Sequence, residues 1–222
     1  MKMTQLCRGS WPGAGGMLIL VSRTRHRAKL RSRATWGQML GRLLIVVGVL
    51  MVLYWGSDFV LASWRQHADD ARWTQVVGPT PAQGDPVGVL ARPVEGMDFK
   101  LLVPKLGYAA VVREGVGLDV LASGPGHYPG TAWPGQGGAV GIAAHNVYWI
   151  RFDQLHAGDG VIVDTRYGAF SYRVTGTRVV SAGDTSVLLP EPGRQLTLTT
   201  CWPLWAGQLA RDRLAIFAAS TP

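Results

Sequence analysis

Short runs of aliphatic and β-branched residues fill the C-terminal part of the chain and predict β-strands. From Met97 onward these runs are separated by glycine, proline, asparagine and aspartate, which favour turns. No long amphipathic helix is indicated between them. We expect strands at residues 99–103, 108–112, 138–144, 160–165, 169–180, 195–200 and 213–218. Short strands at this spacing predict an all-β barrel or sandwich of about 120 residues.

An uncharged apolar run precedes this β-domain. It covers residues 43–57 and is bounded by Arg42 and Asp58. The run is shorter than the roughly 20 residues that a spanning helix needs. However, Arg42 and two flanking tryptophans supply the side chains that settle at a membrane interface. We therefore expect a transmembrane anchor at residues 39–61, with a cleaved signal peptide as the alternative.

The net charge of +8 is distributed unevenly along the chain. Nine of the 22 basic side chains lie within residues 1–42, before the first acidic residue, Asp58. The rest of the chain is close to neutral. A basic leader ahead of an apolar run indicates a cytoplasmic N-terminus and an exported domain. We expect no nucleic-acid partner, since the excess charge belongs to the leader.

Between the apolar run and the β-domain the composition indicates a connection. Residues 58–77 are mixed and weakly helical, and residues 78–96 are rich in proline and glycine. The expected protein is a single-pass protein of the cell membrane whose folded domain lies outside. Its expected parts are a basic cytoplasmic leader (1–38), a transmembrane anchor (39–61), a stalk and Pro/Gly linker (62–96) and a β-barrel domain (97–222).

The two cysteines cannot pair if this topology holds, because Cys7 lies inside and Cys201 outside. An unpaired thiol in an exported domain is either buried and inert or a reactive nucleophile. Cys201 follows the alternating run QLTLTT, which puts leucines on one face of a strand and threonines on the other. Trp202 and Pro203 then stop the ladder. A thiol at a strand end is presented to a cleft.

A reactive thiol usually works with an imidazole and an oxyanion donor. His145 ends the apolar run AVGIAA and is the candidate base, with a hydrogen-bonded edge residue as the alternative. His127 lies in a Gly/Pro-rich loop, where a turn-stabilising role is favoured, and His156 lies in a polar turn. Arg213 opens the last apolar strand, two residues after Arg211. It is the candidate for stabilising the oxyanion.

These residues together resemble the sortases, membrane-anchored cysteine transpeptidases of mainly Gram-positive bacteria, and class E in particular. The TLxTC motif of the family falls on residues 197–201, its histidine on His145 and its arginine on Arg213. The stretches LLVPKLGYAAVVREGV, GPGHYPGTAWPG and YGAFSYRV are also similar to sortase sequence. The resemblance covers roughly residues 97–219. This chain departs from the family pattern at Asn146, where Arg or Thr often follows the histidine.

The resemblance implies a sortase-type eight-stranded β-barrel and a thioacyl mechanism. Cys201 would attack the Thr–Gly carbonyl of an LPxTG-like or LAxTG-like C-terminal sorting signal. His145 would protonate the leaving amine, and Arg213 would steady the oxyanion. An amine on a peptidoglycan precursor or on a pilin would then take the acyl group.

The resemblance also implies where the peptide binds. Residues 184–194 would form part of the groove for the sorting signal. Trp205 is a further candidate for lining that groove. Hydrophobic cover for the barrel mouth is the alternative role for Trp205 and for the neighbouring Trp202. The expected substrate-binding residues are Thr200, Trp202 and Asn146.

No cofactor is expected, and no metal site is indicated because the acidic residues are scattered. Two other functions stay open. One is an extracytoplasmic cysteine protease or hydrolase, in which water takes the place of the amine. A papain-like enzyme is disfavoured, since its cysteine precedes its histidine in the sequence. The other is a catalytically inert domain that binds wall components and keeps a buried thiol.

Overall fold

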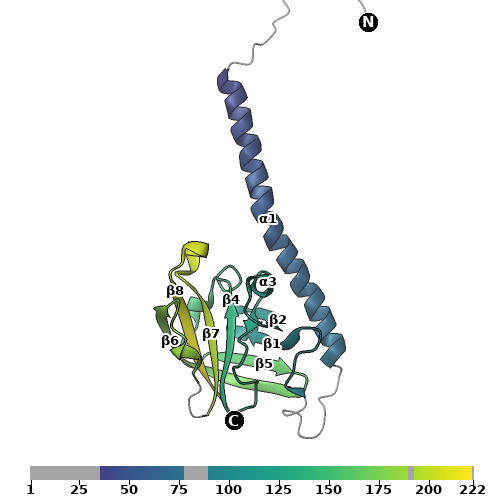
Figure 1. Cartoon of the computed structure of the whole chain (residues 1–222), viewed down its shortest axis with the longest axis vertical. Coiled ribbons are helices and arrows are strands. Elements are labelled where there is room, and N and C mark those ends of the chain that lie inside the picture. Colours follow the sequence, from purple (N-terminus) through teal and green to yellow (C-terminus); the bar gives the residue numbers. More distant parts are fainter. Residues whose placement is uncertain (1–35, 78–89, 190–192, 222) are drawn as a thin grey trace, which may run out of the picture. The chain divides into compact units, whose positions relative to one another are not determined.

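The computed structural model describes residues 36–77, 90–189 and 193–221. A helix is followed by strands joined through short helical turns (Figure 1). Most of the predicted leader and residues 78–89 of the predicted linker lie outside the described residues. The elements are α1 (Trp36–Val77), β1 (Met97–Val103), η1 (Pro104–Leu106), β2 (Tyr108–Glu114), α3 (Leu118–Leu121), β3 (Gly126–His127), β4 (Gly138–Ala144), η2 (Phe152–Gln154), β5 (Gly160–Thr165), β6 (Gly168–Ser181), η3 (Ser186–Leu188), β7 (Arg194–Trp202), η4 (Leu204–Leu209) and β8 (Asp212–Ser220).

The strands close into a barrel in the order β1-β2-β3-β4-β7-β8-β6-β5. Neighbours are antiparallel except for the β2–β3 and β4–β7 pairs, which are parallel. The expected eight-stranded all-β barrel is therefore confirmed. All seven strands expected from the residue pattern are present, with ends that agree within two residues. The eighth, β3, is two residues long and lies in a Gly/Pro-rich loop, so alternation could not indicate it.

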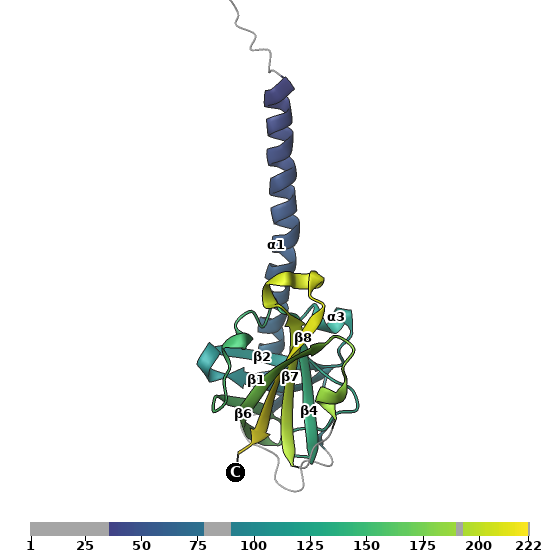
Figure 2. The same cartoon turned by 90° about the vertical axis from the view of Figure 1, so that its left-hand side faces the viewer.

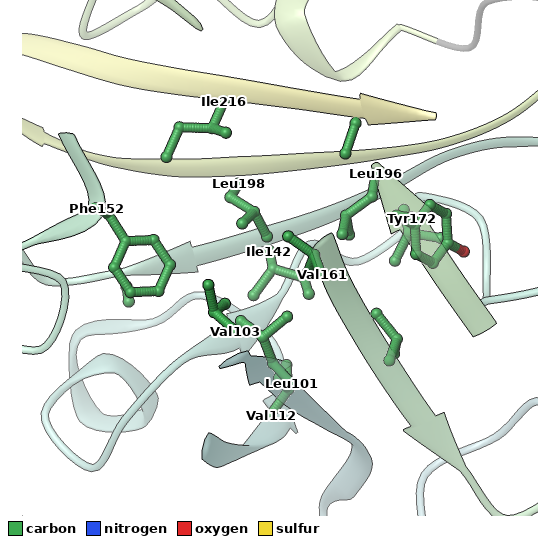
Figure 3. Packing of buried hydrophobic residues seen from close by; sticks show 14 of the residues in the cluster. Leu101, Val103, Val112, Ile142, Phe152, Val161, Tyr172, Leu196, Leu198 and Ile216 are labelled. Atoms are coloured by element: carbon green, nitrogen blue, oxygen red, sulfur yellow. The ribbon is translucent and has the colours of Figure 1, made fainter. Parts of the chain in front are cut away.

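The barrel core is built from the inward positions of these strands. Ile142 of β4 and the leucines of β7 are fully buried there, together with side chains of β1, β2, β5 and β8 (Figure 3). Burying each such side chain contributes about 1.5–3 kcal/mol. Trp149 and Phe152, between β4 and β5, belong to the same cluster, and their rings stack 4.4 Å apart. The segment that follows β4 is therefore anchored in the core.

The chain divides into two units between Val47 and Gly48, a boundary that lies inside α1. Within the described residues, α1 is the helix that is long and apolar enough to cross a membrane, over Trp36–Tyr54. Length and composition are the basis for this statement. The window overlaps the anchor expected at residues 39–61.

The last turns of α1, in the second unit, pack on the barrel. The sequence of these turns predicts no more than a weakly helical stalk. Trp73 is 2% exposed and belongs to the core cluster. Asp69 accepts hydrogen bonds from Arg113 of β2, one of them 2.8 Å long. The side-chain oxygen of Gln66 accepts from Val111 N at 3.2 Å, where β2 has no strand partner on that side. A helix thus satisfies a strand edge that would otherwise lack a partner.

Candidate active site

Cys201 lies one residue before the end of β7. The leucines of β7 point into the core, so the two-residue period of a strand puts Thr199 and Cys201 on the opposite face. The Cys201 side chain is half-buried and unpaired, as the one free cysteine among the described residues. The strand ends at Trp202 because Pro203 has no N–H to continue the ladder. The predicted strand-end position of the thiol is confirmed.

In the barrel, β4 and β8 lie on either side of β7 (Figures 1 and 2). These two strands bring His145 and Arg213 to Cys201. In the parallel β4–β7 ladder Ala144 pairs with Thr200, so the next residue, His145, leaves β4 beside Cys201. In the antiparallel β7–β8 ladder Cys201 and Arg213 are direct partners. Paired residues share a face, and adjacent strands are about 4.8 Å apart. The structure therefore places Cys201 between the histidine and the arginine.

The electrostatics of the site favour a neutral imidazole. Burial lowers the pKa of His145 below its ordinary value of 6.5, and the positive charge of Arg213 lowers it further. The guanidinium of Arg213 also donates a 2.9 Å hydrogen bond to the carbonyl of Asp212. A neutral imidazole can accept a thiol proton and later return it to a leaving amine. A fixed guanidinium can stabilise an oxyanion.

The residues after His145 are tied to two neighbouring loops. Asn146 is buried, and its amide donates a 2.7 Å hydrogen bond to the carbonyl of Leu204 in η4. The Tyr148 hydroxyl donates to the carbonyl of Ala122, just after α3, also at 2.7 Å. These bonds fix the segment in which His145 lies. The expected role of Asn146 in substrate binding stays a prediction, and its amide is already engaged in this contact between loops.

The other two expected substrate-binding residues alternate with Cys201 along β7. Thr200 is 2% exposed, and its hydroxyl has no hydrogen-bond partner within the described residues. Trp202 is half-buried and packs against the core cluster. This contact agrees with its alternative role as hydrophobic cover for the barrel mouth. By contrast, Trp205 in η4 is 85% exposed. Because of the strand period, Thr200 and Trp202 are on the face opposite Cys201, so their role in binding stays a prediction.

The face of β4 and β7 that leads to Cys201 is covered by residues that the sequence analysis did not single out. The Tyr128 hydroxyl lies 3.0 Å from Thr199 Oγ1. A Cβ atom on Gly141 of β4 would come within about 3 Å of Leu188, Thr131 and Tyr128, so these side chains lie directly on the strand. The alternating threonines of β7 were the one sequence feature that could have indicated such covering residues. Buried hydroxyls need hydrogen-bond partners.

Two other histidines do not belong to the group formed by Cys201, His145 and Arg213. His127 of β3 is buried, and its Nδ1 lies 2.8 Å from Asp98 Oδ2. Burial raises the pKa of Asp98, although the contact with His127 acts in the opposite direction. His156 is exposed, with Nδ1 2.7 Å from the carbonyl oxygen of Gln154. Both contacts agree with the structural roles expected in these turns.

A closed β-barrel that presents a cysteine between a histidine and an arginine defines a candidate site for cysteine acyl transfer. The Sortase domain family model matches residues 101–221. Sortase SrtE1 of Streptomyces coelicolor is 31% identical over 209 residues, covering 82% of this chain and 59% of the relative. Sortase D of Bacillus subtilis is 32% identical over 105 residues, covering 46% of this chain and 53% of the relative. The chain belongs to the sortase family.

Solved structures agree with this assignment. A mutant sortase E from Streptomyces avermitilis matches with a TM-score of 0.51 and 30% identity, over 57% of this chain and 91% of that one. A Clostridium perfringens Sortase D5 transpeptidase matches with a TM-score of 0.52 and 30% identity, over 57% and 79%. The chain spans between half and two thirds of the length of the two curated relatives named above. The family resemblance inferred from the sequence is confirmed.

Proposed function

We propose that this chain is a membrane-anchored cysteine transpeptidase. It would cleave a C-terminal sorting signal between Thr and Gly and transfer the new carboxyl end to an amine. The observation that carries this proposal is the strand register that puts Cys201 between His145 and Arg213. Membership of the sortase family supports the same reaction. The apolar stretch of α1, long enough to cross a membrane, supports the anchor.

The reaction consists of two exchanges at one carbonyl carbon. His145 takes the thiol proton as the sulfur of Cys201 attacks the Thr–Gly carbonyl, and the electron pair moves onto oxygen, where Arg213 stabilises it. When the carbonyl reforms, the C–N bond breaks and His145 gives its proton to the leaving amine. An incoming amine then attacks the thioester and loses a proton to His145. The thiolate leaves and is ready for another cycle or for reprotonation.

We propose an LPxTG-like or LAxTG-like signal as the substrate, and an amine of a peptidoglycan precursor or of a pilin as the acceptor. The similarity to Sortase SrtE1 and to a sortase E structure supports a class E-like assignment. Among the structural neighbours, a Clostridium perfringens sortase C was solved with a C-terminal cell wall sorting motif. The single-pass topology would place the N-terminus in the cytoplasm and the barrel outside.

The proposal is tested by trapping the acyl-enzyme. Incubation with a sorting-signal peptide should add the mass of its N-terminal fragment to the protein, and Cys201→Ala should abolish this adduct. Circular dichroism should show the same fold for both proteins, because the side chain is half-buried and outside the core. A Cys201→Ala protein that still turns the peptide over would reject the assignment.

Two alternatives predict different products. A hydrolase would release a free acid whether or not an amine is supplied. A transpeptidase would form the amide product when the amine is present. An inert wall-binding domain would form neither product. In addition, a thiol-reactive probe at neutral pH should label Cys201 of a transpeptidase, and His145→Ala should slow that labelling. Labelling that is independent of His145 would favour the inert domain.

A further inference from the structure

A buried Asp98–His127 pair lies outside the catalytic residues, and the proposed mechanism does not use it. Asp98 of β1 is 2% exposed and His127 of β3 is 4% exposed. Burying ionisable groups is unfavourable unless their geometry and hydrogen bonds compensate for the lost water. Asp98 Oδ2 is 2.8 Å from His127 Nδ1, while Asp98 Oδ1 has no partner within the described residues.

The contacts on the other ring nitrogen locate one proton of His127. Nε2 lies 3.2 Å from the carbonyl oxygen of Ala132, an atom that only accepts. Nε2 therefore carries a hydrogen. It also lies 3.0 Å from Thr131 Oγ1, whose own hydrogen is donated to the carbonyl of Tyr128 at 2.8 Å. The imidazole is the donor toward Thr131, and a second proton is shared between Nδ1 and Asp98.

This donor direction separates the cluster from a catalytic triad. The order carboxylate, imidazole and hydroxyl is that of a Ser/His/Asp site, in which the imidazole accepts the hydroxyl proton. Here the Thr131 hydroxyl is turned away from His127, and its oxygen also accepts from Gly141 N at 3.1 Å. Thr131 is not activated as a nucleophile. Its contacts instead hold the chain after β3 against β4.

The segment that is held, residues 127–133, lies on the backbone of β4. Tyr128 N donates to the carbonyl of Gly141, and Ala132 N donates to that of Ala139, both at 2.9 Å. The Tyr128 side chain then reaches across to β7, where its hydroxyl contacts Thr199. Thr199 is two residues before Cys201 and on the same face. The contacts thus run from the buried carboxylate of Asp98 to Thr199, beside the thiol.

We propose that the Asp98–His127 pair is a positioning element for catalysis, which holds residues 127–133 so that the Tyr128 hydroxyl stays on Thr199 beside Cys201. The inference rests on the proposed function, since it assigns Cys201 the attack on the peptide. Neither Asp98 nor His127 touches the reacting atoms. Their effect is on the surface that a bound peptide meets next to the thiol, and therefore on KM more than on kcat.

Two substitutions of Asp98 form a matched pair. Asp98→Ala removes the bond to His127 Nδ1. In Asp98→Asn the amide N–H can donate to Nδ1 while Nε2–H still donates to Ala132, so the hydrogen bonds survive without the charge. With fluorescence-quenched LPxTG and LAxTG peptides, we expect Asp98→Ala to lower kcat/KM about tenfold, mainly through KM. Asp98→Asn should stay within about twofold of the unaltered chain.

A double-mutant cycle with Tyr128→Phe tests the route of the effect. Tyr128→Phe removes the hydroxyl that contacts Thr199. If Asp98 acts through that hydroxyl, adding Asp98→Ala to Tyr128→Phe should lower kcat/KM by less than about twofold, because coupled residues are not additive. The Tm should still fall in that double variant. If Asp98→Ala does not fold, Thr131→Val interrupts the same hydrogen-bond network at another residue. It should show the same non-additivity with Tyr128→Phe.

Several outcomes would overturn the inference. One is full additivity in the cycle. Another is a lower Tm for Asp98→Ala with kcat/KM unchanged at a temperature where the protein is folded, which is the result of a purely structural pair. The Cys201→Ala protein separates this failure from failure of the proposed function. If that protein still cleaves the peptides, or the unaltered chain cleaves neither, the proposed function fails together with the inference that rests on it.

Discussion

Arg213 acts on both other members of the site. Its backbone pairs with Cys201 across the β7–β8 ladder, and its charge lowers the pKa of His145. Arg211 is the matched comparison, since it is exposed and precedes β8. The sequence alone could rank the two arginines only by their position at the strand start. The register supplies the physical distinction between them.

Replacing Arg213 should therefore cost far more than replacing Arg211. We expect Arg213→Ala to lower kcat/KM by about 100-fold or more, the size of effect typical of a lost oxyanion donor. Arg211→Ala should change it by less than about threefold, because an exposed charge outside the ladder contributes little. Steady-state kinetics with a sorting-signal peptide measures both. Small and equal losses would show that neither arginine stabilises the oxyanion.

The pKa of His145 offers a second test on single side chains. Burial and Arg213 both disfavour the imidazolium, so the ring should titrate below 6.5. Arg213→Gln removes the repulsion but leaves the burial, and the pKa of His145 should rise toward 6.5 without that positive charge. NMR titration of the ring protons measures the midpoint. A midpoint that stays unchanged in Arg213→Gln would mean that the two side chains are not electrostatically coupled.

Site residues could be predicted from the sequence where they belong to a motif. Cys201, His145 and Arg213 were assigned from strand ends and from the family pattern, and the register brings them together. It worked less well for neighbours in the chain. Thr200 and Trp202 adjoin the cysteine in sequence, but the period of the strand turns both to the other face. Adjacent positions in a strand are separated by the sheet itself.

At the level of elements, α1 combines a membrane-type stretch with turns that belong to the barrel. Its apolar window ends at Tyr54, and Trp73 is part of the core cluster. The sequence did not indicate this docking. One buried tryptophan and a few polar contacts do not produce a repeating apolar face along the helix. The contacts that hold the helix depend on strands far away in the sequence. Tertiary structure, and not local pattern, defines this part of α1.

The docking predicts unequal roles for two tryptophans of the same helix. Trp73 is 2% exposed and Trp64 is 69% exposed. We expect Trp73→Ala to lower the free energy of unfolding by about 3 kcal/mol or more, since it leaves a cavity in the core. Trp64→Ala should change it by about 0.5 kcal/mol or less. Denaturant unfolding of the detergent-solubilised chain gives both values. Equal effects would argue that the helix is not docked in solution.

For the molecule as a whole, the β-class and nearly all strands could be predicted because turns and alternating runs mark them locally. The barrel order could not, since β4 pairs with β7 across more than 50 residues and no local signal specifies that ladder. The family resemblance implied an eight-stranded barrel, but not its strand order. The same holds for Tyr128 and Thr199, which are 71 positions apart and meet through the closed sheet.

The proposed topology of the molecule can be tested with its two cysteines. Cys7 precedes the apolar stretch and Cys201 follows it, so one chain carries a thiol for each side of the membrane. A membrane-impermeant maleimide should label Cys201 in intact cells, and Cys7 only after the cells are permeabilised. Cys201→Ala identifies which signal belongs to which thiol. Labelling of Cys7 in intact cells would contradict a cytoplasmic N-terminus.

The ladder between β7 and β8 sets the distance from Cys201 to Arg213, whatever the length of η4 between them. Eight residue pairs define that register, and a slip by one residue would turn Arg213 to the wrong side of the sheet. Residues 203–211 therefore do not need to hold Cys201 and Arg213 together. Insertions and exchanges can accumulate there during evolution, so new specificities can arise in this loop while the chemistry stays intact.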